Sequence, residues 1–338
     1  MCSNYQLPTS NSQLVTRHSS LRTLVTCHSK LVTNKMNNSI EIYNLSKSFK
    51  KVQALDNLSM SVESGGFYGL IGPDGAGKTT LLRILTSLLI PDTGKVLVGG
   101  LDPVKQYKKL RLKLGYMPGR FSLYQDLSVE ENLRFFARVF GTTIKENYHL
   151  IAPVYSQIEP FKDRRAGKLS GGMKQKLALS CALVHKPEIL ILDEPTTGVD
   201  AVSRREFWDM LKGIREKGIT ILVSTPYMEE AILCDKISLM FDGKVIDSGT
   251  PDEITNKFNK RIFNIKTPNV RLVLKLVREM PELLSANSFG QSLHVVAKSD
   301  DLTMDKIGNY IKSKCDTNFE IEVYKAGIED CFIDYIIS

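Results

Sequence analysis

The stretch GPDGAGKT, residues Gly72–Thr79, decides the fold, because its glycines lie directly before a lysine and a threonine. The apolar run Phe67–Ile71 before it has the length of a strand, and Lys78–Leu89 has the apolar spacing of a helix. A glycine-rich loop between a strand and a helix offers backbone N–H groups and a helix dipole to an anion. The sequence therefore predicts an α/β fold with a loop that holds the phosphates of a nucleotide.

Two side chains of this loop have specific expected roles. Lys78 would reach the β- and γ-phosphates as a point charge, and the Thr79 hydroxyl would ligate Mg²⁺. A glycine-rich turn without a ligand is the alternative. The residues expected around the phosphates are Gly72, Pro73, Asp74, Gly75, Ala76, Gly77, Lys78, Thr79 and Thr80.

A second segment, ILILDEP at Ile189–Pro195, combines a buried strand with two carboxylates at its end. Ligands of open α/β sheets bind at the carboxyl ends of the strands. Asp193 is expected to hold Mg²⁺, directly or through water. Glu194 lies one residue further toward the γ-phosphate and is the candidate general base. A lone acidic pair would indicate only a solvated strand end, but this pair follows a phosphate loop.

The third segment is LSGGMKQ at Leu169–Gln175, in which Ser170 is expected to cap a helix. Gly171 and Gly172 leave the backbone bare, so an anion can approach the helix dipole. In this order the three segments closely resemble the ATP-binding subunit of an ABC transporter. The resemblance covers residues 36–260, and it implies ATP and Mg²⁺ as ligands and a mixed-sheet ATPase core with a helical subdomain.

The resemblance also implies a second subunit, because ABC proteins bring this signature to the nucleotide of the opposite subunit. The chain holds one phosphate loop and one signature, so it needs a partner, either an identical copy or a paralogue. Gln175 belongs to the nucleotide-facing signature, and Gly198–Asp200 would communicate across the dimer. Phe49 would stack on adenine, although a lone aromatic beside a strand can also belong to the core.

Two positions depart from the family pattern. A glutamine that touches Mg²⁺ and the attacking water usually follows the strand that here ends at Met117-Pro118, but the chain has Gly119 and then Arg120. A histidine that contacts the γ-phosphate usually stands where this chain has Pro226, which offers no donor. Each lost charge-assisted contact costs about 1.5–3 kcal/mol. The sequence therefore predicts a slow ATPase.

Composition limits the other possibilities. No apolar run of the chain reaches the roughly 18–20 residues that cross a bilayer, so the transport pathway is expected in another polypeptide. Six cysteines without a C-x-x-C pair fit a reducing cytosol. Half of the net charge of +8 lies in residues 1–35, and no basic stripe with interleaved aromatics predicts nucleic-acid binding.

The first 35 residues form a polar, imperfect repeat, QLVTRHS and then TLVTCHSKLVT, and are expected to be a disordered extension. We interpret them as a translated upstream repeat with the native start at Met36. A real tail that binds anionic lipid is the alternative.

Residues about 120–168 are predicted to be the helical subdomain, with Ser128 as a helix cap. Its groove is expected to receive a coupling helix from the permease. Residues 261–338 are predicted to form a small ferredoxin-like α+β domain in the order β-α-β-β-α-β. The runs Phe121–Leu133 and Gly327–Ile336 resemble the drug- and polysaccharide-exporting branch, whose permeases are of type 2.

These observations favour the ATP-hydrolysing subunit of an exporter, peripheral on the inner face of the cell membrane and working as a dimer. A regulatory subunit that binds ATP and is paired with an active paralogue is the main alternative, because of Gly119 and Pro226. A soluble ABC ATPase acting on ribosomes or DNA is a further alternative. Ser170 follows Lys78 by only 92 positions, which is too few for the long insertions of that class.

Overall fold

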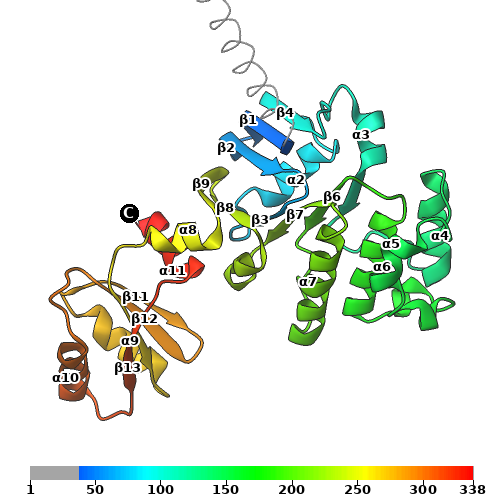
Figure 1. Ribbon diagram of the computed structural model, residues 1–338. Coiled ribbons are helices and arrows are strands. Elements are labelled where there is room, and N and C mark those ends of the chain that lie inside the picture. Colours follow the sequence, from blue (N-terminus) through cyan, green and yellow to red (C-terminus); the bar gives the residue numbers. More distant parts are fainter. Residues whose placement is uncertain (1–37, 338) are drawn as a thin grey trace, which may run out of the picture.

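A six-stranded sheet forms the centre of the computed structural model, which describes residues 38–337 (Figure 1). Its strand order is β5-β6-β7-β3-β8-β9, and all neighbours are parallel except β9, which runs antiparallel to β8. The strands are β3 (Phe67–Ile71), β5 (Leu114–Met117), β6 (Ile189–Asp193), β7 (Thr220–Thr225), β8 (Lys236–Phe241) and β9 (Lys244–Gly249). This is the mixed α/β sheet that the sequence predicted.

Both faces of the sheet are covered. Along β6, Ile189 and Ile191 pack into one hydrophobic cluster, whereas Leu190 and Leu192 pack into a second cluster on the opposite face. The alternation follows from the two-residue period of a strand. The polar residues Asp193 of β6 and Ser224 and Thr225 of β7 stand at the carboxyl ends of their strands.

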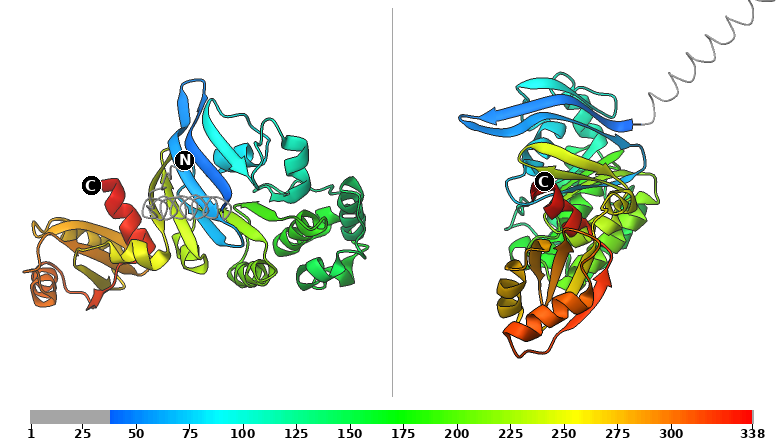
Figure 2. Two further views of the ribbon diagram at one scale, coloured as in Figure 1. Left: turned by 45° about the horizontal axis from the view of Figure 1, so that its top comes forward. Right: turned by 90° about the vertical axis from the view of Figure 1, so that its left-hand side faces the viewer.

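A three-stranded antiparallel sheet and helix α2 cover one face (Figure 2). The strands lie in the order β2-β1-β4, namely β2 (Val52–Glu63), β1 (Asn38–Phe49) and β4 (Thr93–Val98). Helix α3 (Tyr107–Lys113) precedes β5. Helix α2 spans Lys78–Leu85 and is shorter than the predicted Lys78–Leu89. It ends because Ser87 adopts a left-handed φ of 61°, and the Leu88 N–H bonds back to the Arg83 carbonyl oxygen.

The helices between β5 and β7 belong to the hydrophobic cluster on the other face of the sheet (Figure 1). They are α4 (Val129–Val139), α5 (Tyr148–Tyr155), α6 (Gly171–Leu183) and α7 (Ala201–Arg215), with short 3₁₀ turns η1 (Glu159–Phe161) and η2 (Ala166–Lys168). The predicted cap of α4 is present: the Ser128 hydroxyl accepts the N–H of Glu131, whose carboxylate returns to the Ser128 N–H. This capping box starts α4 at one defined residue.

The C-terminal part forms a second, antiparallel sheet in the order β11-β12-β10-β13. Its elements are β10 (Ile262–Lys266), α9 (Val270–Arg278), β11 (Leu283–Phe289), β12 (Ser292–Ala297), α10 (Met304–Lys314) and β13 (Glu320–Tyr324). Both helices pack into one cluster on one face of the sheet. The element order and strand order are those of the predicted ferredoxin-like layer.

The last helix, α11 (Ile328–Ile337), leaves this layer and packs on the ATPase core (Figure 1). It contacts α8 (Pro251–Asn256) and the 3₁₀ turn η3 (Met228–Leu233). Phe332 of α11 meets Phe241 edge-on at 6.0 Å between ring centroids. The end of the chain is therefore part of the larger core cluster. Among residues 38–337, the helices are all too short or too polar to span a bilayer.

Candidate functional site

The loop between β3 and α2 adopts a conformation that requires glycine at its two ends. A Cβ on Gly72 would lie 2.2 Å from the Met240 carbonyl oxygen, and one on Gly77 would lie 2.4 Å from that of Ala54. Gly77 also has φ of 100° and caps α2 without a side-chain hydrogen bond. The first N–H groups of α2 are therefore free of a side-chain cap and can bind an anion.

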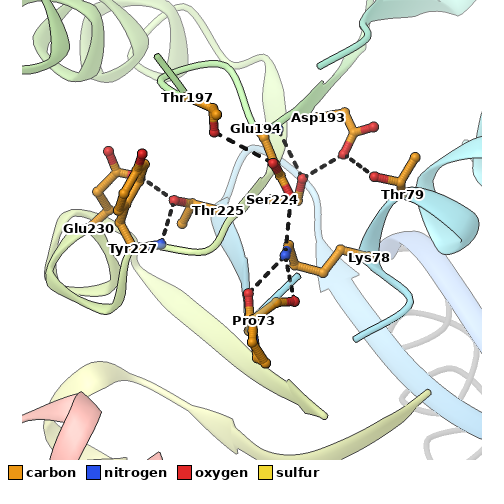
Figure 3. A network of polar contacts seen from close by, with 11 residues as sticks. Pro73, Lys78, Thr79, Asp193, Glu194, Thr197, Ser224, Thr225, Tyr227 and Glu230 are labelled. Carbon is orange, nitrogen blue, oxygen red and sulfur yellow. Dashed lines mark hydrogen bonds and ion pairs between the residues drawn. The ribbon is translucent and has the colours of Figure 1, made fainter. Parts of the chain in front are cut away.

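Lys78 is almost completely buried in this loop (Figure 3). Its Nζ donates to the carbonyl oxygens of Gly72 at 2.8 Å and Pro73 at 3.0 Å. The same atom lies 3.1 Å from Oε1 of Glu194, in an ion pair that joins the first and second motifs. The loop, the lysine and the expected general base thus meet at one place.

Asp193 is the centre of a second cluster (Figure 3). Its Oδ1 accepts hydrogen bonds from the Thr79 hydroxyl at 3.0 Å and from the Ser224 hydroxyl at 2.9 Å. The Ser224 hydroxyl also accepts the N–H of Glu194 at 3.0 Å. Sequence reasoning missed Ser224, because nothing local distinguishes a serine at the end of a strand.

Glu194 has a left-handed φ of 48°, which is uncommon for a residue other than glycine. Its N–H bonds to both the carbonyl oxygen and the hydroxyl of Ser224. Its side chain is about one-fifth exposed, so a water molecule can reach the carboxylate. Strained backbone of this kind persists only where surrounding contacts hold it.

Gly119 and Pro226, the two residues expected to depart from the family pattern, both lie next to the carboxylates. A Cβ on Gly119 would come within 3.0 Å of the Asp193 carbonyl oxygen, so the backbone of Gly119 lies directly against the end of β6. Pro226 directly follows Thr225, the last residue of β7, and so lies at the same edge of the sheet. Nearby, burial and the Asp193 carboxylate raise the pKa of Tyr116 to about 12, so this phenol remains protonated.

The signature lies on the other face of the sheet from α2 (Figure 1). Ser170 caps α6, as expected, and its hydroxyl accepts the N–H of Met173. A Cβ on Gly172 would lie 3.0 Å from the Ser203 hydroxyl of α7. A Cβ on Gly171 would have no neighbour closer than 3.8 Å. The side-chain oxygen of Gln175 is buried without a hydrogen-bond partner among the described residues.

The two remaining predicted residues lie at the surface. Phe49 ends β1 with about half of its area exposed, and the Lys47 ammonium lies 5.6 Å from its ring centroid. Asp200 caps α7 by accepting the N–H groups of Val202 and Ser203. The bond from Ser203 is the largest cause of the lowered pKa of Asp200.

A largely apolar groove of about 300 Å³ lies between β5, α4 and α6. Its lining includes Leu88, Met117, Phe136 and Phe140. His185 stacks on Phe140 with 3.8 Å between ring centroids, and its Nε2 contacts the Leu114 carbonyl oxygen. Burial lowers the pKa of His185 to about 4. The imidazole is therefore neutral at pH 7, and the groove favours an apolar occupant.

A glycine loop on a helix N-terminus, with a lysine, a threonine and two carboxylates around it, defines a P-loop nucleotide-binding domain. Residues 55–197 match the protein family described as ABC transporter. The chain is 39% identical to the probable multidrug ABC transporter ATP-binding protein YbhF of Escherichia coli K12 over 84% of its own length. It spans about half of YbhF, 49%.

A second relative is matched over more of its length. The chain is 39% identical to the Nod factor export ATP-binding protein I of Burkholderia lata, covering 63% of this chain and 71% of that protein. The chain therefore belongs to the ATP-binding proteins of the ABC transporter family, as its motifs predicted.

Solved structures agree with this assignment. An ATP-binding subunit of an ABC transporter matches with a TM-score of 0.60 at 28% identity, over 65% of this chain and 92% of that one. The ATP-binding cassette MJ0796, solved as a dimer bound to ADP and Pi, matches with a TM-score of 0.57 at 26% identity. That match covers 62% of this chain and 98% of MJ0796.

Proposed function

We propose that this chain binds and hydrolyses ATP as a dimer and thereby drives a separate membrane permease, as an exporter subunit on the inner face of the cell membrane. The observation that carries the proposal is the meeting of Lys78, Thr79, Asp193 and Glu194 at the carboxyl edge of the sheet. The names of the relatives, a multidrug transporter protein and a Nod factor export protein, support the direction of transport.

ATP would enter by replacing contacts that Lys78 makes within the chain. Its ammonium bonds to two loop carbonyl oxygens and to Glu194, which are acceptors that phosphate oxygens can replace. The exchange releases Glu194 toward the γ-phosphate. Backbone N–H groups of the loop after Pro73 and of the first turn of α2 then surround the phosphates, and Phe49 stacks on the adenine.

Thr79 and Asp193 fit a magnesium ion. The hydroxyl and the carboxylate lie 3.0 Å apart and are hard oxygen ligands, which Mg²⁺ combines with phosphate oxygens and water. When bound with the nucleotide, Mg²⁺ would neutralise charge on the β- and γ-phosphates. Ser224 would hold the Asp193 carboxylate in place for this task.

Glu194 would orient and polarise the water that attacks the γ-phosphorus. Gly119 and Pro226 leave this water without the usual glutamine and histidine. If each lost contact served only the transition state, the rate would fall about ten- to a hundredfold. We therefore propose slow turnover with an intact general base.

The composite site would form between two chains. In one chain Ser170–Gln175 and the phosphate loop lie on opposite faces of the sheet, so the signature of one subunit would complete the site of the other. Gly198–Asp200 lie beside this signature and would contact the partner. The dimeric structure of MJ0796 supports this arrangement. Closure around two nucleotides is the bistable step that would drive the permease.

The groove beside α4 would receive the permease. Its apolar lining and neutral His185 suit a helix with an apolar face rather than a nucleic acid. Exposed aromatics at its margin, Tyr124 and Phe135, stack edge-on at 5.0 Å and extend the apolar surface.

A regulatory subunit paired with an active paralogue is the second candidate. Gly119 and Pro226 favour it, because they remove two contacts to the reacting groups. Glu194, which retains both its position and its access to water, counts against it.

The test compares ATP turnover of the full chain with that of Glu194→Gln, while light scattering follows dimerisation at saturating Mg-ATP. We expect slow turnover that the substitution abolishes, together with an ATP-stabilised dimer of the variant. No turnover in either protein, despite ATP binding, would exclude the hydrolytic role and favour the regulatory one.

A further inference from the structure

A buried carboxylate outside the proposed mechanism bridges the loops that follow β6 and β7. Glu230 of η3 is only 2% exposed. Its Oε1 accepts a hydrogen bond from the Thr196 hydroxyl at 2.9 Å. Its Oε2 accepts one from the Thr225 hydroxyl (Figure 3). Both threonines are fully buried. A buried carboxylate with two hydroxyl donors is a specific arrangement, because an unpaired one would be strongly destabilising.

The two threonines control the backbone around the reacting groups. Thr196 follows Glu194 by two residues in the loop after β6. Thr225 ends β7, and its carbonyl oxygen accepts the N–H of Gly72, the first residue of the phosphate loop. The Thr225 hydroxyl also accepts the N–H of Tyr227 at 3.1 Å, across Pro226. One carboxylate is thus connected to the loop after β6, to the loop after β7 and, through Thr225, to the first residue of the phosphate loop.

Arg204 of α7 lies near this carboxylate, while its Nη1 pairs with Glu229 at 3.4 Å. Its Nε lies 3.7 Å from Oε1 of Glu230, and its guanidinium lies 4.0 Å from the ring centroid of Tyr227. The planar guanidinium can pair with a carboxylate and stack on an aromatic ring simultaneously. Asp200 caps the same helix. Through α7, the contacts of Glu230 and Arg204 therefore also connect to the loop expected at the dimer interface.

We propose that Glu230 is a positioning residue for ATP hydrolysis, which ties the loop of Glu194 to the loop of Pro226 through Thr196 and Thr225. The inference rests on the proposed hydrolytic function of Glu194. That residue has a strained backbone, which surrounding contacts must hold. In a chain without the usual histidine, Glu230 is the residue that keeps these two loops rigid.

The test uses four variants of the full chain, with kcat, KM and the affinity for ADP measured for each. Thr225→Val and Thr196→Val remove one donor to Glu230 at nearly constant volume, and Thr225→Ser retains the donor. Thr220→Val is the matched control, because Thr220 is a buried threonine at the opposite end of β7, where its hydroxyl accepts the N–H of Gly65.

We expect kcat to fall at least tenfold in both bridging variants, which corresponds to 1.36 kcal/mol of activation free energy. The ADP affinity should stay within twofold, Thr225→Ser should retain at least half of the activity, and Thr220→Val should lose stability but not kcat. If Thr225→Val does not fold, Thr196→Val and Thr225→Ser still decide the question.

Two results would overturn the inference while leaving the hydrolytic function intact. The first is a kcat within twofold of the unchanged chain in the bridging variants. The second is a fall of kcat that Thr220→Val reproduces. A chain whose turnover does not depend on Glu194 would overturn the proposed function, and this inference with it.

Discussion

Replacing Ser224 by alanine tests how the site holds Asp193, the carboxylate proposed to bind Mg²⁺. Ser224 is fully buried, and its hydroxyl is one of two side-chain donors to Oδ1 of Asp193. A hydrogen bond to a charged group contributes about 1.5–3 kcal/mol. The Glu194 N–H also donates to this hydroxyl, but in the variant it still donates to the Ser224 carbonyl oxygen. Losing the contact with the hydroxyl therefore adds little to the destabilisation. The free energy of unfolding should therefore fall by about 1.5–3 kcal/mol.

The assay is thermal unfolding of the nucleotide-free chain, followed by circular dichroism. At about 2–4 °C per kcal/mol, the melting temperature should fall by about 3–12 °C. Ser238→Ala is the matched control: Ser238 is equally buried on β8, but its hydroxyl pairs with the neutral Tyr68 hydroxyl at 3.0 Å. The Ser238→Ala substitution should lower the free energy of unfolding by about 1 kcal/mol. Equal effects of the two substitutions would refute the reasoning that charge makes the Ser224 contact strong.

Two further predictions concern parts of the chain outside the phosphate loop. Phe332→Ala should lower the free energy of unfolding by about 3–5 kcal/mol, because the buried ring joins α11 to the core; a denaturation midpoint equal to that of the unchanged chain would contradict this packing role. Burial lowers the pKa of His185 from 6.5 to about 4, so below pH 6.5 the unfolded chain takes up a proton that the folded chain does not. Stability should fall as the pH drops from 6.5 to 4, by up to about 3 kcal/mol from this group. His185→Phe should lack this component, and identical pH profiles of the melting temperature in both proteins would exclude it.

Much of the fold followed from local sequence. The loop-helix start at Gly77-Lys78 and the caps of α4 and α6 at Ser128 and Ser170 are each built from neighbouring residues. The apolar run Ile189–Leu192 predicted a buried strand correctly. The end of α2 was placed too late, because Ser87 adopts a left-handed φ of 61° and the Leu88 N–H turns back to the Arg83 carbonyl oxygen.

The path of the last helix was not predicted. The residues Gly327–Ile336 suggested a branch of the family, but nothing in their spacing indicated which surface they would cover. In the structure, α11 leaves the small sheet for the ATPase core, where Phe332 meets Phe241. Apolar residues are attracted to any apolar surface, so their sequence alone does not choose between two cores.

The sequence by itself determined the kind of loop, the pair of carboxylates and the presence of Gly119 and Pro226 near them, since these depend on residue identity along short segments. Only the tertiary structure decided that Ser224 holds Asp193, 31 residues away, and that Glu230 joins Thr196, 34 residues away. Serine, threonine and glutamate are common at surfaces and become specific only when burial removes water as their partner. That burial is created by strands brought side by side from distant parts of the chain.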